Sequence, residues 1–287
     1  MRTSSRYKQI PFLLFVALIS LGALSTVVPI SSAATSVSLG SAGSYGVLAG
    51  VGILNTGATT IIGDQGSSPT ATYSGFSKVT LTGATHLGDP AAATAQVDAK
   101  SSYKNLVLQP TTQLIVADLG GQILGPGVYT TGASIGITGK LILDAKGDPS
   151  AVFIFKAGST LTTSDASSMS MTNGASQCNV FWLVGSSASL GANSTFLGTV
   201  LASSNITAGT GATIFGRLLA LKGTTLLDSN LITVSTCATQ PAISPTSPAG
   251  SRSLAQVPIW PKGAVNTGDG SLGKIESVNC DEIARFS

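Results

Sequence analysis

Short runs of β-branched and apolar residues alternate with Gly, Ser and Asn from about Ala34 to Ala238. This pattern predicts many short strands separated by turns. One segment differs, because apolar residues after Asp89-Pro90 recur at spacings of three and four up to Leu108. An aspartate followed by proline at the first helical position begins a helix well, so a single amphipathic helix is predicted over residues 90–108.

A repeat of 18 residues marks the second half of this region. The sequence GTVLA at 198–202 returns as GRLLA at 216–220, and the same step backwards reaches VFWLV at 180–184. Phe196, Ile214 and Ile232 keep the same spacing, and residues 47–63 fit the same frame. A fixed short period with strand-like pieces predicts an all-β solenoid, a β-helix whose coils must stack to bury their apolar faces.

The two ends of the chain differ from the repetitive region over 34–238. Basic residues at 2, 6 and 8 precede an apolar run at 12–24, and small residues follow at 31–34. These features predict a secretory signal peptide over 1–33, cleaved after Ala33 or Ala34, with an uncleaved membrane anchor as the alternative. Residues 239–250 are predicted to form a Pro/Ser/Thr-rich linker, and residues 251–287 are predicted to form a poorly ordered tail.

Charge and cysteine content narrow the classes of function. Charged residues make up 9% of the chain and the net charge is +3, which is too small to indicate nucleic-acid binding. Gly-rich pieces such as Gly125-Pro126-Gly127 lack the strand and helix of a nucleotide site, so no cofactor is expected. Export permits a disulfide between Cys178 and Cys237; three unpaired thiols are the alternative. The cysteines show no metal-binding spacing.

Several motifs together resemble the bacterial and fungal ice-binding proteins, a family first catalogued as a domain of unknown function. They are, in chain order, residues 47–50, 55–57, 63–64, 119–121, 125–129, 143–145, 151–155, 179–182 and 216–220. The resemblance covers about residues 34–238. It implies a discontinuous right-handed parallel β-helix of triangular section, with one α-helix alongside and the N-terminal coils closing against the C-terminal coil. It also implies adsorption to ice through one flat face.

Catalysis is the alternative to test, because some β-helical proteins act on polysaccharides. Such sites need carboxylates gathered in a groove, whereas the acids of the repetitive region are scattered Asp residues beside Gly or Pro, where Asp caps turns. The single histidine, His86, is expected in a loop before the helix, and Asp64 and Asp144 are expected to be structural. Arg217 is expected to pair with carbonyls or an acid. The sequence therefore favours a protein that is not an enzyme.

Ice adsorption calls for a flat, stiff surface with small methyl and hydroxyl groups at a regular spacing. Stacked strands repeat at about 4.7–4.9 Å, so a Thr at the same place in successive coils forms a ladder. We align Leu190, Ala208 and Leu226 as inward positions. The preceding coil is expected to carry insertions after its first strand, so we match Leu161 to Leu190. The candidate face then comprises Thr56, Thr160, Thr162, Ser189, Thr207, Thr210 and Thr225. Strand propensity alone would also place Thr here, and either other side of the triangle could be the binding face.

The sequence thus predicts a secreted or cell-surface associated, monomeric protein whose partner is the surface of an ice crystal. A cell-surface adhesive or structural solenoid module is the alternative, motivated by the linker and the tail.

Overall fold

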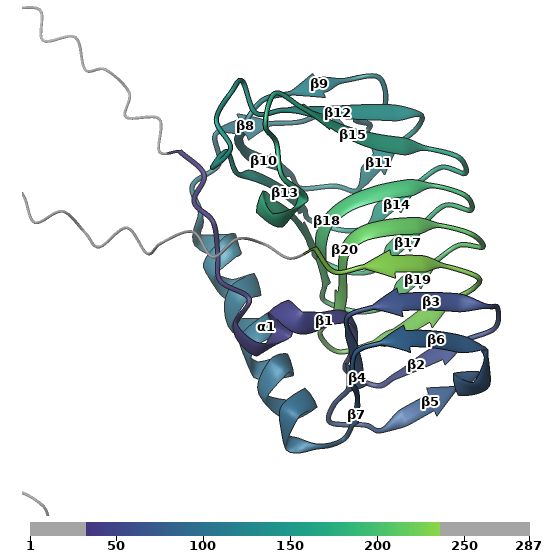
Figure 1. Ribbon diagram of the computed structural model, residues 1–287. Coiled ribbons are helices and arrows are strands. Elements are labelled where there is room, and N and C mark those ends of the chain that lie inside the picture. The colour runs from purple at the N-terminus through teal and green to yellow at the C-terminus, as the bar shows by residue number, and fades with distance from the viewer. Residues whose placement is uncertain (1–32, 236–287) are drawn as a thin grey trace, which may run out of the picture. The chain divides into compact units, whose positions relative to one another are not determined.

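The computed structural model describes residues 33–235, which form a discontinuous right-handed parallel β-helix of triangular section with one α-helix along its side (Figure 1). The predicted fold class is therefore confirmed. Residues 1–32 of the predicted signal peptide, the linker over 239–250 and the tail over 251–287 lie outside the described residues, so these three predictions stay predictions.

The helix α1 (Pro90–Leu108) has the bounds predicted from the sequence. The Asp89 carboxylate accepts a hydrogen bond from the backbone N–H of Ala92 at 2.8 Å, which satisfies one of the free donors at the helix start. The helix buries Ala92, Ala95, Ala99 and Leu106. Three of these four side chains are methyl groups, so the helix can lie close to the sheet that it covers.

We call the side of the triangle beneath α1 the helix face. Its apolar side chains pack with those of α1 in one cluster that includes Leu48, Ile154, Phe181, Leu201 and Leu219. A 3₁₀-helix, η1 (Gly40–Ser44), also contributes to this cluster through Ala42. In spatial order the strands of this face are β7 (Thr85–Leu87), β4 (Asp64–Ser67), β1 (Tyr45–Ala49), the second halves of β20 (Thr213–Ala220) and β18 (Thr195–Ala202), β16 (Val180–Val184), β13 (Phe153–Ala157), β10 (Gly127–Thr131) and β8 (Gln113–Leu114).

We call the second side the seven-strand face, because it is a separate sheet of seven parallel strands. Its strands are short and each belongs to a different coil. In spatial order they are β11 (Ile135–Ile137), β14 (Leu161–Thr163), β17 (Ala188–Leu190), β19 (Ile206–Ala208), β21 (Thr224–Leu227), β2 (Gly52–Asn55) and β5 (Thr72–Ser74).

The third face is joined to the helix face, because β18 and β20 run through the corner between them. Gly198 and Gly216 form this corner with φ values of 102° and 154°. A Cβ on Gly216 would lie 1.8 Å from the Gly198 carbonyl oxygen, so only glycine fits there. In spatial order the strands are β9 (Ile123–Leu124), β12 (Lys140–Asp144), β15 (Ser168–Thr172), the first halves of β18 and β20, β22 (Leu231–Thr233), β3 (Thr59–Ile62) and β6 (Val79–Thr82), with η2 (Phe76–Lys78) just before β6.

The coil order in space differs from the order in sequence. The first coil, β1 to β3, stacks on the last coil: β1 pairs with β20, β2 with β21 and β3 with β22. The implied closure of the N-terminal coils on the C-terminal coil is therefore confirmed. The 18-residue register also holds along the third face, where Phe196 pairs with Ile214 and Ile214 with Ile232.

A row of aromatic rings fills the solenoid interior. Tyr129 and Phe155 stack with centroids 5.2 Å apart, Phe155 and Trp182 stack at 4.0 Å, and Trp182 and Phe196 lie at 5.3 Å. The Trp182 indole N–H donates to the Leu197 carbonyl at 3.0 Å, so this buried polar atom is satisfied. Rings from successive coils thus hold the stack rigid behind the exposed faces.

Two sequence expectations about local structure were wrong. His86 lies in strand β7 rather than in a loop, and its ring contacts the Asp89 carboxylate at 2.7 Å. The insertion in the coil before Val180 was expected after its first strand. It follows the third strand instead, where the chain passes through η3 (Gln177–Asn179), because β13 and β14 keep the same 27-residue step to β16 and β17.

Candidate functional site

The seven-strand face is free of α1 and carries no charged side chain on its strands. Sequences such as ITA in β19 and ASL in β17 contain no Asp, Glu, Lys, Arg or His, and the same holds for the other described strands of this face. Side chains alternate across the sheet: Ile206 and Ala208 are buried, while Thr207 between them is partly exposed. The face is therefore a sheet lined by neutral and mostly small side chains.

The central column of this face is defined by strand pairing. Thr162 pairs with Ser189, Ser189 with Thr207, and Thr207 with Leu226. Leu226 then pairs with Leu54, and Leu54 with Ser74. Three predicted residues, Thr162, Ser189 and Thr207, thus lie in one column, each contributed by a different coil.

A second outward column lies two residues before the central one and is held by hydrogen bonds. The Thr160 hydroxyl donates to Ser134 Oγ at 2.8 Å. Ser187 Oγ accepts from the Asn205 backbone N–H at 3.3 Å, and Asn205 Oδ1 accepts from the Thr224 backbone N–H at 2.9 Å. These bonds run from coil to coil, so the hydroxyl and amide groups have fixed positions before any ligand arrives.

The predicted position of Thr225 is wrong. Thr225 pairs with Ile206, a step of 19 residues rather than 18, and its side chain is fully buried. Leu226 takes the outward place and is 41% exposed. The extra residue lies in the turn before β21, and a shift of one residue moves every side chain of a strand to the other side of the sheet.

The placement of Thr160 also needs correction. Leu161 pairs with Ala188 rather than matching Leu190, so Thr162 stands beside Ser189. Thr160 belongs to the second column. Both threonines remain on the seven-strand face, with Thr162 exposed and Thr160 partly exposed.

Thr56 and Thr210 lie at one edge of the face, in turns that follow its strands. The Thr210 hydroxyl donates to Asp228 Oδ2 at 2.6 Å, and that bond, with further bonds from Ser229 and Thr56, lowers the pKa of Asp228. Lys78 Nζ donates to the Thr56 carbonyl at 2.9 Å. Asp228 and Lys78 thus lie beside the flat area and not on its strands, whereas Asp118, which forms a β-bridge with Gly136, lies at the β11 end of the sheet.

The helix α1 does not cover the third face either, and this face has a Thr ladder that was not predicted from the sequence. Thr195 pairs with Thr213, Thr213 with Leu231, and Leu231 with Thr60, in one column. The adjoining column is bulkier, with Phe215 and the 41% exposed Ile62. Lys140 and Asp144 lie at one end. This face is less uniform and carries charge on its strands.

Cys178 in η3 is disulfide-bonded. It is the one cysteine among residues 33–235, so its partner lies outside the described residues, as does the predicted partner Cys237. The Cys178–Cys237 pairing therefore stays a prediction.

The aspartates predicted to be structural accept hydrogen bonds from backbone N–H groups in turns. Asp64 accepts from the Ala84 backbone N–H at 2.8 Å, and Asp144 accepts from the Lys146 backbone N–H at 2.8 Å. Arg217 Nε donates to the Gly43 carbonyl at 2.7 Å, as expected for a pairing with carbonyls. Over residues 33–235 no three His, Cys, Asp or Glu side chains are close enough to hold a metal ion together.

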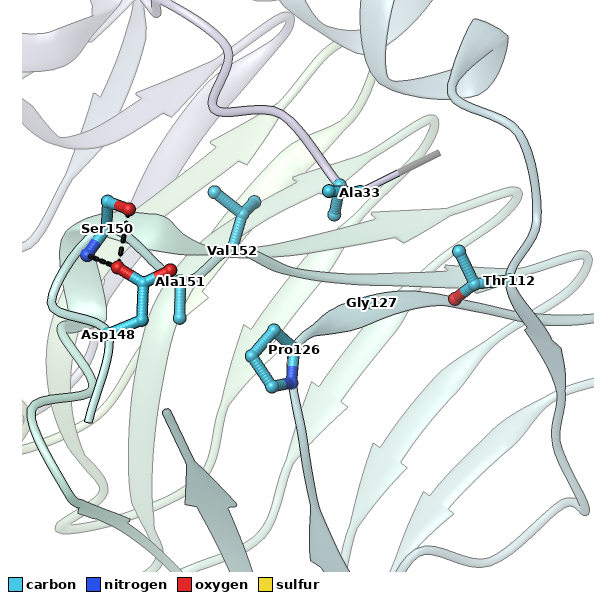
Figure 2. A pocket seen from close by; sticks show the side chains of 9 residues that line it. Ala33, Thr112, Pro126, Gly127, Asp148, Ser150, Ala151 and Val152 are labelled. Carbon is cyan, nitrogen blue, oxygen red and sulfur yellow. Dashed lines mark hydrogen bonds between the residues drawn. The ribbon is translucent and has the colours of Figure 1, made fainter. Parts of the chain in front are cut away.

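A pocket lies where the N-terminal segment meets β10 and β13 (Figure 2). Asp148 is the single titratable residue among the nine that line it, and its carboxylate accepts from both the N–H and the hydroxyl of Ser150 at 2.8 and 2.6 Å. These bonds lower the pKa of Asp148. A lone carboxylate does not supply the acid and base pair that glycoside hydrolysis needs. Within the described chain, no helix has the length and hydropathy to span a membrane.

Comparison with known proteins gives a consistent result. A sequence model of the ice-binding-like family matches residues 47–233. The chain is 40% identical over 243 residues to an ice-binding protein of Nostoc sp. (strain HG1). The aligned segment covers 84% of this chain and 90% of that protein.

Two solved structures have folds similar to that of this domain. The crystal structure of an ice-binding protein from the Antarctic ascomycete Antarctomyces psychrotrophicus superposes with a TM-score of 0.69 at 41% identity, covering 71% of this chain and all of that one. The DUF3494 domain of Shewanella frigidimarina ice-binding protein 1 superposes with a TM-score of 0.67 at 28% identity, covering 70% and 98%.

Proposed function

Because the chain belongs to the ice-binding-like family, we propose that it is exported and adsorbs to ice through the seven-strand face. The single observation that carries the choice of face is a sheet, free of α1, whose strands bear no charged side chain and whose outward columns hold mainly Thr, Ser, Asn and Gly in successive coils. The central column runs through Thr162, Ser189 and Thr207.

The physical case begins with spacing. Backbone hydrogen bonding sets about 4.7–4.9 Å between neighbouring strands, so equivalent side chains repeat at that distance along the solenoid. Ordered water at an ice surface is also periodic, and a stiff array can match it over several coils. The hydrogen bonds between Thr160 and Ser134 and between Asn205 and Thr224 reduce the side-chain freedom that adsorption would otherwise have to remove.

The absence of charge on these strands supports the same face. A charged side chain holds its own hydration tightly, and burying it against a solid costs free energy unless it is paired. Leu54 and Leu226 interrupt the hydroxyl column, but they add apolar area that would be removed from water on contact. The third face lacks this uniformity, because Lys140 and Asp144 lie on its strands.

Matched substitutions on two faces test the proposal. Thr207 and Thr195 are both partly exposed strand residues, on the seven-strand face and the third face respectively. We expect Thr207→Tyr to remove most of the thermal hysteresis and recrystallisation inhibition, since its ring would prevent flush contact. Thr195→Tyr and Lys100→Tyr on α1 should keep both activities. Each exposed change should alter the free energy of unfolding by about 0.5 kcal/mol or less.

Two results would contradict this assignment. If Thr195→Tyr abolished activity and Thr207→Tyr did not, the third face would bind ice. If the unsubstituted protein showed neither thermal hysteresis nor recrystallisation inhibition, ice would not be its ligand. N-terminal sequencing of the protein recovered from the culture medium tests export, with Ala34 or Thr35 expected as the first residue.

A further inference from the structure

We propose that Asn205 and Asn193 are acceptor sites for N-linked glycosylation, and that a glycan on Asn205 switches off the seven-strand face. The second part rests on the proposed function of that face. The first part concerns a covalent modification and stands on sequence and geometry alone.

The acceptor tripeptide is Asn, any residue except Pro, then Ser or Thr. The whole chain contains two such tripeptides, Asn193-Ser194-Thr195 and Asn205-Ile206-Thr207. Both have threonine in the third position, and they lie in neighbouring coils at the seven-strand face. An exported chain can meet the transferase that reads this motif, so the predicted signal peptide and the motif are compatible.

The side chain of Asn205 is accessible in the folded protein. Asn205 is exposed just before β19, and its Oδ1 accepts from the Thr224 backbone N–H at 2.9 Å. Its Nδ2, the atom that would carry the sugar, makes no hydrogen bond within the described chain. A glycan on Nδ2 therefore leaves the bond to Thr224 in place, and the folded structure tolerates the modification.

Asn193 is equally open. It lies in the turn between β17 and β18 with φ of 53°, a conformation that Asn adopts more readily than most residues. It is exposed, and its Nδ2 also lacks a hydrogen-bond partner among residues 33–235. This turn is at the edge of the seven-strand face, where the chain crosses to the third face.

The transfer requires a lipid-linked pyrophosphate oligosaccharide as donor. The Asn Nδ2 forms a bond to C1 of the first sugar and loses a proton. The bond between C1 and the pyrophosphate oxygen breaks, and the lipid pyrophosphate leaves with the electron pair. No oxidant or reductant takes part.

The position of Asn205 explains why its modification would matter for ice. Strand alternation places Asn205 and Thr207 on the same side of the sheet, with Ile206 facing inward. Two residues along a strand span about 6.5 Å, so the glycan would emerge beside the central column. An oligosaccharide is bulky and strongly hydrated. It would therefore hold the face away from any flat surface.

The test produces the full chain through two secretory routes. One host is a yeast that has the transferase, and the other is a bacterium that exports to the periplasm and lacks it. Mass spectrometry of the peptides gives the occupancy of each Asn. To isolate Asn205, thermal hysteresis is compared between the yeast and the bacterial products of the same Asn193→Gln chain, which differ only in the glycan on Asn205. We expect the yeast product with Asn205 glycosylated to be several-fold less active than the bacterial product of identical sequence.

A matched control carries a glycan elsewhere. Val107→Thr turns the exposed Asn105 on α1 into an acceptor, and in the doubly substituted Asn193→Gln, Asn205→Gln chain the glycosylated yeast product should be as active as the bacterial product of the same sequence. Unmodified Asn193 and Asn205 in the yeast product would overturn the acceptor assignment. Full activity with Asn205 glycosylated would overturn the switch. An inactive bacterial product would refute the proposed function, while the occupancies measured by mass would still decide the acceptor sites.

Discussion

At the scale of single residues, the inward or outward direction of one threonine decides what its hydroxyl can do. Thr207 and Thr225 are both strand threonines in neighbouring coils, yet Thr207 is partly exposed and Thr225 is fully buried. The Thr225 hydroxyl lacks a hydrogen-bond partner among the described residues. A buried polar atom without a partner costs free energy, so the two positions should respond oppositely to substitution.

Thr225→Val should stabilise the protein without changing its adsorption to ice. Valine has nearly the shape of threonine, and removal of an unsatisfied buried hydroxyl should raise the free energy of unfolding by about 1 kcal/mol. Chemical denaturation measures the change, and thermal hysteresis should equal that of the unsubstituted protein. A marked loss of stability would mean that this hydroxyl has a partner after all.

At the scale of elements, the sequence predicts the bounds of the helix well and the residues of the seven-strand face only in part. The bounds of α1 follow from Asp89, Pro90 and the spacing of apolar residues, which are local signals. The 18-residue period is equally visible and holds along the third face. It fails by one residue at β21, because the turn after Ala220 is one residue longer and the next turn is one residue shorter. A compensated change of this kind leaves the period intact on either side.

The same reasoning explains what was missed. Leu226 takes its place in the central column because the turn before β21 is one residue longer, and it pairs there with Leu54 of the remote strand β2. On the third face the 18-residue period relates Thr195, Thr213 and Leu231, whereas Thr60 joins their column only through the closure of the first coil on the last. Neither the one-residue shift nor the closure has a local signal. Pairing between distant strands is fixed by stacking of the coils, and a single sequence does not reveal it.

The cap of α1 makes an element-scale prediction. Asp89→Ala removes the hydrogen bond to the Ala92 N–H and the contact with His86, so the free energy of unfolding should fall by about 1 kcal/mol. Lys104→Ala, on the exposed side of α1, serves as the control and should change little. Thermal denaturation followed by circular dichroism compares the two. Equal stability of both variants would show that the cap contributes nothing.

The seven-strand face also predicts how activity depends on pH. The one titratable group on its described strands is Tyr73 in β5, whose pKa is raised by burial. The acids beside the face, Asp118 and Asp228, have pKa values lowered chiefly by the Thr138 and Thr210 hydroxyls. A lowered pKa in the folded state gives stability that is present above the ordinary value and lost as pH falls through the folded one. Thermal hysteresis should thus be constant from about pH 5 to about pH 9 and change only in stronger acid. A step near neutral pH would contradict a neutral binding face.

At the scale of the whole molecule, the closure of the first coil on the last one changes how the solenoid should unfold. In a simple solenoid each repeat contacts only its neighbours, so the ends can open separately. Here the neighbours β1 and β20 are far apart in sequence, and α1 packs against side chains from both the N-terminal and the C-terminal coils. Loss of the first coil would expose the last one, so the two should unfold together.

Leu48 tests this coupling. Its side chain is fully buried in the cluster beneath α1, and its strand partner is Leu219 in β20. Leu48→Ala should lower the free energy of unfolding by about 2–5 kcal/mol, in a single transition. Amide exchange should accelerate together in β1 to β3 and in β20 to β22, because each coil leaves the other without its strand partner. Leu114→Ala is the control, since Leu114 is 79% exposed in β8 at the opposite end of the solenoid. If exchange accelerated only in β1 to β3, the first coil would open independently, and the closure would add contact area to the fold without joining its ends into one cooperative unit.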